Sequence, residues 1–258
     1  KLDAEDAEGN TALHCAVERE DEDMMGKLLA AGADANAANT EGKTPLHLAV
    51  RSKETELVNK LIKAGADPNA RDLFLRRSPM LLACGSGEPA MVSALLENGG
   101  DWAARDADGY NALSYAVGSG NREVVNMLLR RGAKPTLTAE GENLFHDAAM
   151  GGQVQMIPII LDLECDINRR SKAGKTPLHY ALLLGDLSEF LLRDTLQALL
   201  KHGADPTIKD NDGVSPLDAA KQDWVKKMML AGGKLPPDAP QDPAMETGGD
   251  PLESVPVE

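Results

Sequence analysis

The sequence predicts an all-α solenoid in which short helix-turn-helix units stack in one direction. The first observation is an internal repeat: residues 44–70 align with residues 11–37 without a gap, and Thr, Leu, His, Ala, Val, a Leu pair, Gly-Ala-Asp and Asn coincide. The second is a step of about 33 residues, the length of one two-helix repeat unit. The third is an aromatic content of only 3%, because small and aliphatic side chains fill the close contacts of such an array.

The same register continues down the chain to residue 233. The first helix of each unit is expected to start after a short polar residue, namely Thr11, Thr44, Ser78, Asn111, Asn143, Thr176 and Ser215. A side-chain oxygen at this place can accept a hydrogen bond from an unpaired backbone N–H. One unit is too small to bury its own apolar face, so only stacking buries it. We therefore expect one array of about seven units over residues 1–233.

Unit two shows how the residues specify each element. Pro45 follows Thr44 at the first helical position, where its missing N–H costs nothing. Helical spacing of apolar residues predicts a second helix, and these residues are Leu57, Val58, Leu61 and Ile62. Gly65 then ends this helix in the left-handed conformation that glycine tolerates, and residues 67–69 turn the chain outward.

These motifs resemble the ankyrin repeat. The resemblance rests on TPLHLA with GADPN, TALHCA with GADAN, TPLHYA with GADPT, and SPLDAA near the end, all in one register over nearly all of residues 1–233. It implies helix-turn-helix units joined by β-hairpin-like fingers. It also implies that the histidines of the TPLH motif bond to the backbone of neighbouring turns, and these are His14, His47, His146 and His179.

Three stretches depart from the repeat. The finger at 72–78 reads DLFLRRS, so it has lost its glycine and gained a residue. In unit five Pro158 falls inside the expected second helix, which should start late or kink, and Glu164 replaces the left-handed glycine. Unit six holds six extra residues. The spacing of its leucines predicts a lengthened second helix within residues 187–202, after an altered entry loop.

The two ends of the chain differ from the array. Residues 234–258 are rich in proline, glycine and acidic residues, which predicts a disordered acidic tail. Residues 1–3 align with the end of a unit, so we expect the natural protein to continue upstream.

Composition excludes several classes of function. A net charge of −14 argues against binding to the nucleic-acid backbone, which needs a basic face. No stretch approaches the roughly 18 apolar residues of a membrane span. Cys15, Cys84 and Cys165 lie in different units and form no C-x-x-C pair, which indicates reduced thiols in an intracellular protein of the cytoplasm or nucleus.

The sequence also lacks a pattern for catalysis. The histidines do not have metal-ligand spacing, and the Gly-Ala-Asp aspartates occur once per unit, so they specify no carboxylate pair. No phosphate-binding glycine loop is present. We therefore expect no catalytic residue, no metal site and no cofactor.

A partner-binding surface remains. The resemblance implies a concave groove lined by the fingers and by the ends of the first helices, and tyrosines are favoured anchors in interfaces. The candidate partner-binding residues are Arg51, Phe74, Arg76, Arg77, Asp108, Tyr110, Tyr115, Tyr180, Leu183 and Leu184. Two alternatives without partner binding stay open. In one, Phe74 folds back onto neighbouring fingers; in the other, Tyr115 and Tyr180 pack between units.

The sequence thus predicts a monomeric scaffold or adaptor that binds a protein partner. Acidic fingers prevail, so a partner with basic patches is favoured. Two other functions stay open. The array can be the targeting region of a larger multidomain enzyme or signalling protein. It can also be a substrate for asparagine hydroxylation, which the resemblance implies at Asn36, Asn69 and Asn168.

Overall fold

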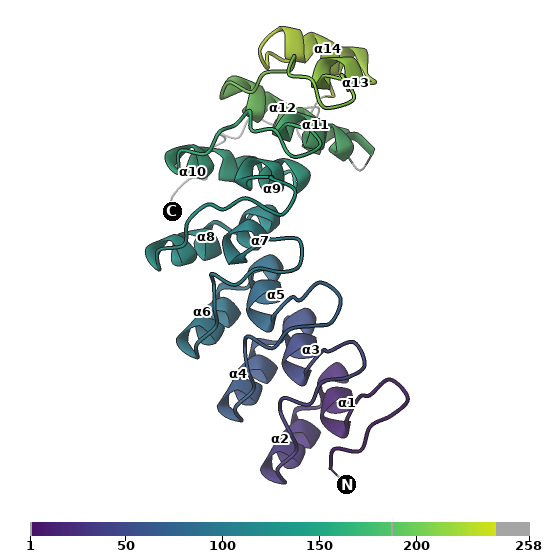
Figure 1. The fold of residues 1–258 in the computed structure, drawn as a ribbon, viewed down its shortest axis with the longest axis vertical. Helices are drawn as coiled ribbons and strands as arrows, with labels where there is room; N and C mark the ends of the chain where they lie inside the picture. The colour runs from purple at the N-terminus through teal and green to yellow at the C-terminus, as the bar shows by residue number, and fades with distance from the viewer. Residues whose placement is uncertain (1, 187, 241–258) are drawn as a thin grey trace, which may run out of the picture.

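The structure is a computed structural model that describes residues 2–186 and 188–240. Over these residues the chain forms an elongated stack of helix pairs with two rows of helices (Figure 1). The first row is α1 (Ala12–Glu18), α3 (Pro45–Ser52), α5 (Pro79–Ser86), α7 (Ala112–Ser119), α9 (Leu144–Met150), α11 (Pro177–Ala181) and α13 (Pro216–Ala219). The second row is α2 (Glu22–Ala30), α4 (Thr55–Lys63), α6 (Pro89–Glu97), α8 (Arg122–Arg130), α10 (Ile157–Asp162), α12 (Glu189–Lys201) and α14 (Asp223–Leu230). The predicted all-α solenoid is confirmed.

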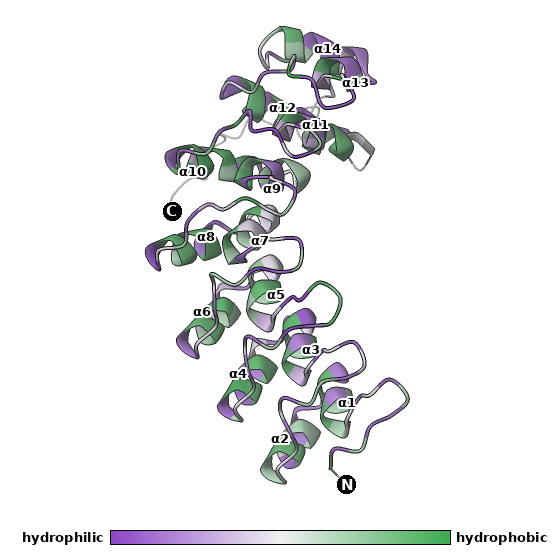
Figure 2. Ribbon diagram, viewed as in Figure 1, coloured by the Kyte–Doolittle hydropathy of each residue, from purple (hydrophilic) through white to green (hydrophobic). Residues whose placement is uncertain are grey.

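The core is a continuous strip between neighbouring units, as modular stacking requires. Each first helix packs on the next one along the row. One apolar residue at the same place in each of the first six units is buried, and these are Leu13, Leu46, Met80, Leu113, Phe145 and Leu178. Figure 2 shows hydrophobic residues mainly in the helices, with the finger between α4 and α5 as an apolar exception among the fingers.

Backbone hydrogen bonds hold the fingers together. Each finger is closed by one bond of the hairpin type, such as Asp106 N–H to the Tyr110 carbonyl at 3.0 Å. A second set links neighbouring fingers, such as Ala107 N–H to the Leu75 carbonyl at 2.7 Å. One such link joins every neighbouring pair of the seven fingers. Among the described residues the only β pairing is a single bridge between Arg105 and Asn111, so the fingers are turns rather than strands.

The TPLH histidines have the structural role that the resemblance implies. In unit two the His47 Nδ1 accepts from the Thr44 N–H at 3.1 Å, and its Nε2 lies 3.1 Å from the Arg77 carbonyl in the next finger. His14, His146 and His179 repeat both contacts. These contacts require a neutral ring that carries its proton on Nε2, so each ring joins a helix start to the following finger.

His47→Leu should therefore destabilise the array by about 1–3 kcal/mol, because the buried Thr44 N–H loses its acceptor. The Arg77 carbonyl keeps a hydrogen bond from the Asp72 N–H, so the loss of its contact with His47 adds little to the destabilisation. Thermal unfolding followed by circular dichroism measures the effect. The matched control is His202→Leu, at an exposed site after α12. An equal change in both variants would contradict the proposed role of His47.

The departures from the repeat in units three and five change only the local backbone conformation. Arg76 takes the place of the missing finger glycine with a φ of 54°, and Glu164 takes that of the turn glycine with a φ of 56°. Left-handed backbone costs a non-glycine residue about 1 kcal/mol. The second helix of unit five starts late, as Pro158 predicts: a 3₁₀ turn, η1 (Val154–Met156), precedes α10, and Pro158 lies in its first turn.

The structure confirms part of what the sequence predicts for the C-terminal end of the array. The lengthened second helix of unit six is α12, with 13 residues, although residue 187 lies outside the described residues. Beyond the array, the Arg193 side chain donates to the Pro240 carbonyl at 2.6 Å, and Lys227 pairs with Asp238 at 2.6 Å. Residues 234–240 of the predicted disordered tail therefore make defined contacts. The rest of that tail, 241–258, lies outside the described residues.

Asparagine side chains connect some units on the side of the turns that follow the second helices. The Asn36 amide donates to the Gly65 carbonyl at 2.9 Å, and its oxygen accepts from the Asp67 N–H at 2.7 Å. Asn69 and Asn168 form the same pair of bonds with their next units. Ala103 and Thr136 stand at this place in units three and four. We call the three bonded asparagines the turn clips; their hydroxylation stays a prediction.

Candidate functional site

A row of hollows runs along the array where the fingers meet the first helices. The two hollows nearest the N-terminus share Lys43, Leu48 and Arg51. The hollow nearest the C-terminus combines finger residues such as Val214 with Leu183. A larger cavity lies between them, and we call this row of four the groove.

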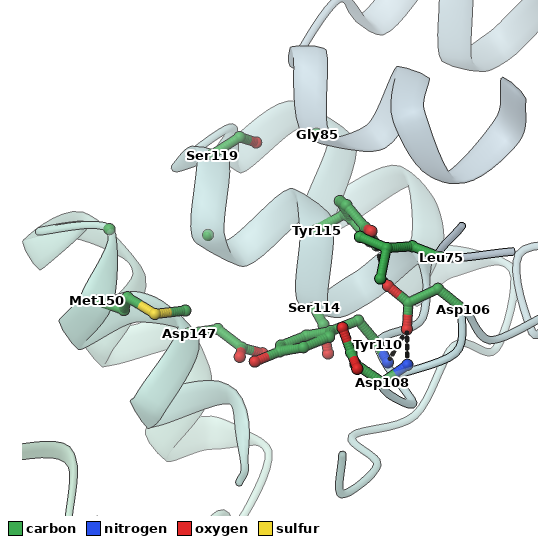
Figure 3. A pocket seen from close by; sticks show the side chains of 12 residues that line it. Leu75, Gly85, Asp106, Asp108, Tyr110, Ser114, Tyr115, Ser119, Asp147 and Met150 are labelled. Atoms are coloured by element: carbon green, nitrogen blue, oxygen red, sulfur yellow. Dashed lines mark hydrogen bonds between the residues drawn. The ribbon is translucent and has the colours of Figure 1, made fainter. Parts of the chain in front are cut away.

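The central cavity of the groove has a volume of about 430 Å³ and is built by three consecutive units (Figure 3). Its lining comes from two fingers and from α5, α7 and α9. The lining residues are Leu75, Gly85, Asp106, Asp108, Tyr110, Ser114, Tyr115, Gly118, Ser119, Asp147, Met150 and Gly151.

The cavity exists because two side chains are small where other units carry large ones. Ser114 stands at the place of the TPLH histidine, so no imidazole fills the space between α7 and the next finger. Gly118 stands where unit two has Arg51. A Cβ atom added at Gly118 would have no atom within 4 Å. The array is therefore close-packed except at its centre, where these two small residues leave a cavity.

Most polar groups around the cavity are satisfied. The Asp106 carboxylate accepts from the N–H groups of Asp108 and Tyr110 at 3.0 and 2.9 Å, and from the Tyr115 hydroxyl at 2.8 Å. Figure 3 shows the two backbone bonds as dashed lines. The Tyr110 and Tyr115 rings meet edge to face at 6.3 Å. Burial, followed by the bonded carboxylate, raises the pKa of both hydroxyls, so both rings stay protonated donors at neutral pH.

Glu142 joins three units beside the cavity. It is buried and accepts from the Tyr110 hydroxyl at 2.8 Å, the Thr138 hydroxyl at 3.1 Å and the Tyr180 hydroxyl. Burial and this carboxylate raise the pKa of Tyr180 to about 12. The Tyr180 ring also packs edge to face on His146 at 5.1 Å. Buried networks of this kind stay rigid when every member is paired.

Asp147 is the exception among these polar groups. Its side chain is 3% exposed, and neither carboxylate oxygen has a hydrogen-bond partner. Burial raises the pKa of this carboxyl well above its usual range; the nearby Ser114 hydroxyl offsets part of the shift, and the Glu142 charge adds to it. In Figure 3 the side chain reaches from α9 towards Tyr110.

The structure places most predicted binding residues along the groove. Asp108, Tyr110 and Tyr115 line the central cavity. Arg51 lines both N-terminal hollows and pairs with Glu18 at 3.6 Å. Arg77 lines one of the N-terminal hollows and Leu183 lines the C-terminal one, whereas Tyr180 lines none of the four. Arg77 pairs with Asp72 at 3.4 Å, and Leu183 is 59% exposed. Tyr180 contacts the preceding unit through Glu142, as the inter-unit packing alternative predicts. Tyr115 bonds to Asp106 in the finger of its own unit and faces the cavity.

Phe74 and Arg76 lie at the tip of the third finger. Phe74 is 72% exposed and its neighbour Leu73 is 69% exposed. The alternative in which Phe74 folds back onto neighbouring fingers is therefore wrong. The Asp72 carboxylate holds this longer loop by accepting from the Leu75 and Arg77 N–H groups at 3.0 and 3.1 Å.

Leu184 does not lie on the surface, and its assignment to the groove is wrong. The side chain is 3% exposed. The reason is local: α11 ends at Ala181 and continues as a 3₁₀ turn, η2 (Leu182–Asp186). A 3₁₀ turn holds three residues per turn instead of 3.6, so Leu184 rotates into the core while Leu183 stays outside.

Sequence analysis missed two residues of the site. Asp147 stands where the other first helices carry apolar or small residues, such as Leu48 and Tyr115. The signal in the sequence was an acidic residue at a helix position that carries apolar or small residues in the other units. Glu142 precedes a helix start and gave no comparable signal.

No group of three or more potential metal ligands occurs among the described residues. None of the helices they form is long and apolar enough to span a membrane.

Comparison with known families decides the classification. A family model described as ankyrin repeats in three copies matches residues 1–72, 73–139 and 134–210. The chain belongs to the ankyrin repeat family. This ankyrin array also matches parts of longer curated proteins. It is 34% identical over 151 residues to the E3 ubiquitin-protein ligase KEG of Arabidopsis thaliana, covering 53% of this chain and 9% of that protein.

A second relative is the mitochondrial disaggregase of Bos taurus, 34% identical over 126 residues, with 47% of this chain and 18% of that protein covered. The ankyrin array therefore spans less than a fifth of these two relatives. Among solved structures it is similar to the ankyrin repeat domain of Bcl-3, with a TM-score of 0.61 and 29% identity over 86% of this chain and 99% of that one. The human ASB11 ankyrin repeat domain has a TM-score of 0.71 at 23% identity, over 88% and 100%, which supports the fold alone.

Proposed function

We propose that this ankyrin array is a protein-interaction module, not an enzyme, and that it binds its partner along the groove and at the tip of the third finger. The observation that supports this most directly is the groove itself. Its hollows follow one side of the array from unit one to unit seven. A surface held by stacked helices and linked fingers loses little conformational entropy when a partner binds.

The partner's chemistry follows from charge. The chain carries a net charge of −14, so a partner with basic patches associates faster and more selectively than an acidic one. We place the array inside the cell because its three cysteines are free thiols. We also propose that it is a monomer. Size-exclusion chromatography with light scattering tests the oligomeric state.

A second candidate function is that of a targeting region within a larger enzyme or signalling protein. The match to 9% of an E3 ubiquitin ligase and 18% of a disaggregase favours this candidate. It uses the same groove, so one binding experiment tests both.

The experiment uses the full chain to select binders from a displayed library of protein fragments. Selected fragments are then titrated against three variants. Asp108→Lys and Leu183→Asp alter exposed groove residues, and Phe74→Ala combined with Arg76→Ala removes the finger tip. If the proposal holds, the groove variants bind at least about tenfold more weakly, a loss of about 1.4 kcal/mol.

The control variant is Lys63→Glu, which alters an exposed residue of α4 in the other row of helices. Its affinity should stay within about twofold, as for a surface charge far from an interface. The proposed function is wrong if no selected fragment distinguishes the groove and finger variants from the wild type.

A further inference from the structure

Asp147 combines three properties that a purely structural aspartate does not need. It is almost fully buried, its carboxylate oxygens have no hydrogen-bond partner, and it lines an open cavity. Leaving a carboxylate buried without a partner costs free energy. Leu48 shows that an apolar residue fits this place in the repeat, so the repeat itself does not require the acid.

We propose that the central cavity binds a basic side chain of the partner, an arginine by preference, and that Asp147 is its counter-ion. The proposal rests on the proposed function, because it assigns one subsite of the groove. The cavity is open to the groove and holds about 430 Å³, room for a guanidinium group and part of its aliphatic stem.

Charge favours a cation over other occupants. Asp106, Asp108 and Asp147 all line the cavity, and no arginine, lysine or histidine does. An anion would meet these carboxylates, and an apolar side chain would leave Asp147 unpaired. A basic side chain would give the carboxylate the charge-assisted hydrogen bonds that it lacks.

The aromatic wall favours arginine over lysine. Tyr110 and Tyr115 line the same cavity, and their rings meet at 70°. A guanidinium group is planar, is less strongly hydrated than an ammonium group, and stacks on aromatic faces. The hydroxyls of both tyrosines are already bonded to Glu142 and Asp106, so the rings are held in place before the side chain enters.

Asp106 and Glu142 cannot substitute for Asp147. Asp106 accepts three hydrogen bonds, and Glu142 accepts from three hydroxyls. Asp108 is exposed at the mouth of the cavity, where it attracts the cation without being desolvated. Asp147 is the acceptor that remains.

The direct test titrates the full chain with N-acetyl-arginine amide and follows backbone amide signals by NMR. The neutral isostere N-acetyl-citrulline amide is the ligand control. We expect saturable shifts for the amides around Gly118 and Asp147 with the arginine probe, and at least about tenfold weaker binding of the citrulline probe.

Two variants test the site by different means, one through charge and the other through volume. Asp147→Leu removes the counter-ion. Gly118→Met puts a large side chain into the cavity, and methionine is the residue that unit five carries at this place, Met150. Both should weaken the arginine probe at least about tenfold, while amide signals of units one and seven stay unchanged and report a folded array. Asp108→Asn, at the exposed mouth, should weaken it by a smaller factor.

The inference is overturned if the arginine probe gives no saturable shift at the cavity, if citrulline binds equally well, or if Asp147→Leu binds like the wild type. These outcomes differ from failure of the proposed function. If library fragments depend on the groove but need no basic residue, only the cavity assignment fails. If no fragment depends on the groove, the interaction function itself fails.

Discussion

Acidification from about pH 7 to about pH 5 should remove several kcal/mol of unfolding free energy from the array. His14, His47, His146 and His179 are buried, and burial lowers the pKa of each. In the unfolded chain they take up protons near pH 6.5. In the folded chain they take up protons only at lower pH, because protonation would remove the Nδ1 acceptor from the N–H at each helix start.

The sign follows from linkage. Stability contributed by these histidines is fully present above about pH 6.5 and is lost as the pH falls through their lowered folded pKa values. Each histidine protonated only in the unfolded state costs about 1.4 kcal/mol per pH unit. Carboxylates of the unfolded chain titrate near pH 4. Asp147, whose folded pKa is raised, acts in the opposite direction and offsets part of this loss.

Thermal unfolding by calorimetry between these pH values measures the loss. Replacement of two of the four histidines, His14 and His179, by leucine should lower stability at pH 7 and flatten its pH dependence. A melting temperature that does not change over the window would contradict the assignment of four neutral, backbone-bonded rings.

Asp147→Leu should stabilise the array by about 1–3 kcal/mol at neutral pH, because it removes an unpaired buried carboxylate. The cavity gives the leucine side chain room, and Leu48 occupies the same place in unit two. Most substitutions of buried residues destabilise proteins, so an increase would be diagnostic. The increase would also mean that the wild type keeps Asp147 at the expense of stability.

The pH dependence of this effect has the opposite sign to that of the histidines. The folded pKa of Asp147 is raised, so its destabilising effect grows as the pH rises from about 4 towards that value. Asp147→Leu should thus gain little stability near pH 4 and progressively more as the pH rises towards neutral. Asp108→Leu, at an exposed site in the same cavity, is the control and should change the melting temperature little. An unchanged or lower melting temperature for Asp147→Leu would refute the account.

The sequence was sufficient for features that depend on neighbouring residues. The helix starts at Thr44 and Ser78, with a proline next, and the glycine turn at Gly65 each depend on a few consecutive residues. The late start of α10 at Pro158 is local in the same way. The repeated motifs then located the start of each first helix.

The placement of Leu184 and the folded-back alternative for Phe74 were wrong because both depend on more than local pattern. The register of the first helix placed Leu184 in the groove, but the change from α-helix to 3₁₀ turn after Ala181 rotates it into the core. The exposure of Phe74 depends on how far the longer third finger extends beyond its neighbours, which the inserted residue alone does not determine.

The central cavity was not predictable from a single repeat. It arises from side chains that are small in unit four, Ser114 and Gly118, next to an acid supplied by unit five, Asp147. Each substitution looks minor when units are aligned one at a time. Only stacking shows that they face the same space.

The turn clips have a mechanical consequence. Links between fingers run along the whole array, whereas Ala103 and Thr136 interrupt the clips in units three and four. In the middle of the array, neighbouring units are thus linked through their fingers but lack the clips between their turns. We expect bending to concentrate there, which would let the walls around the central cavity close on an inserted side chain while both ends keep their shape.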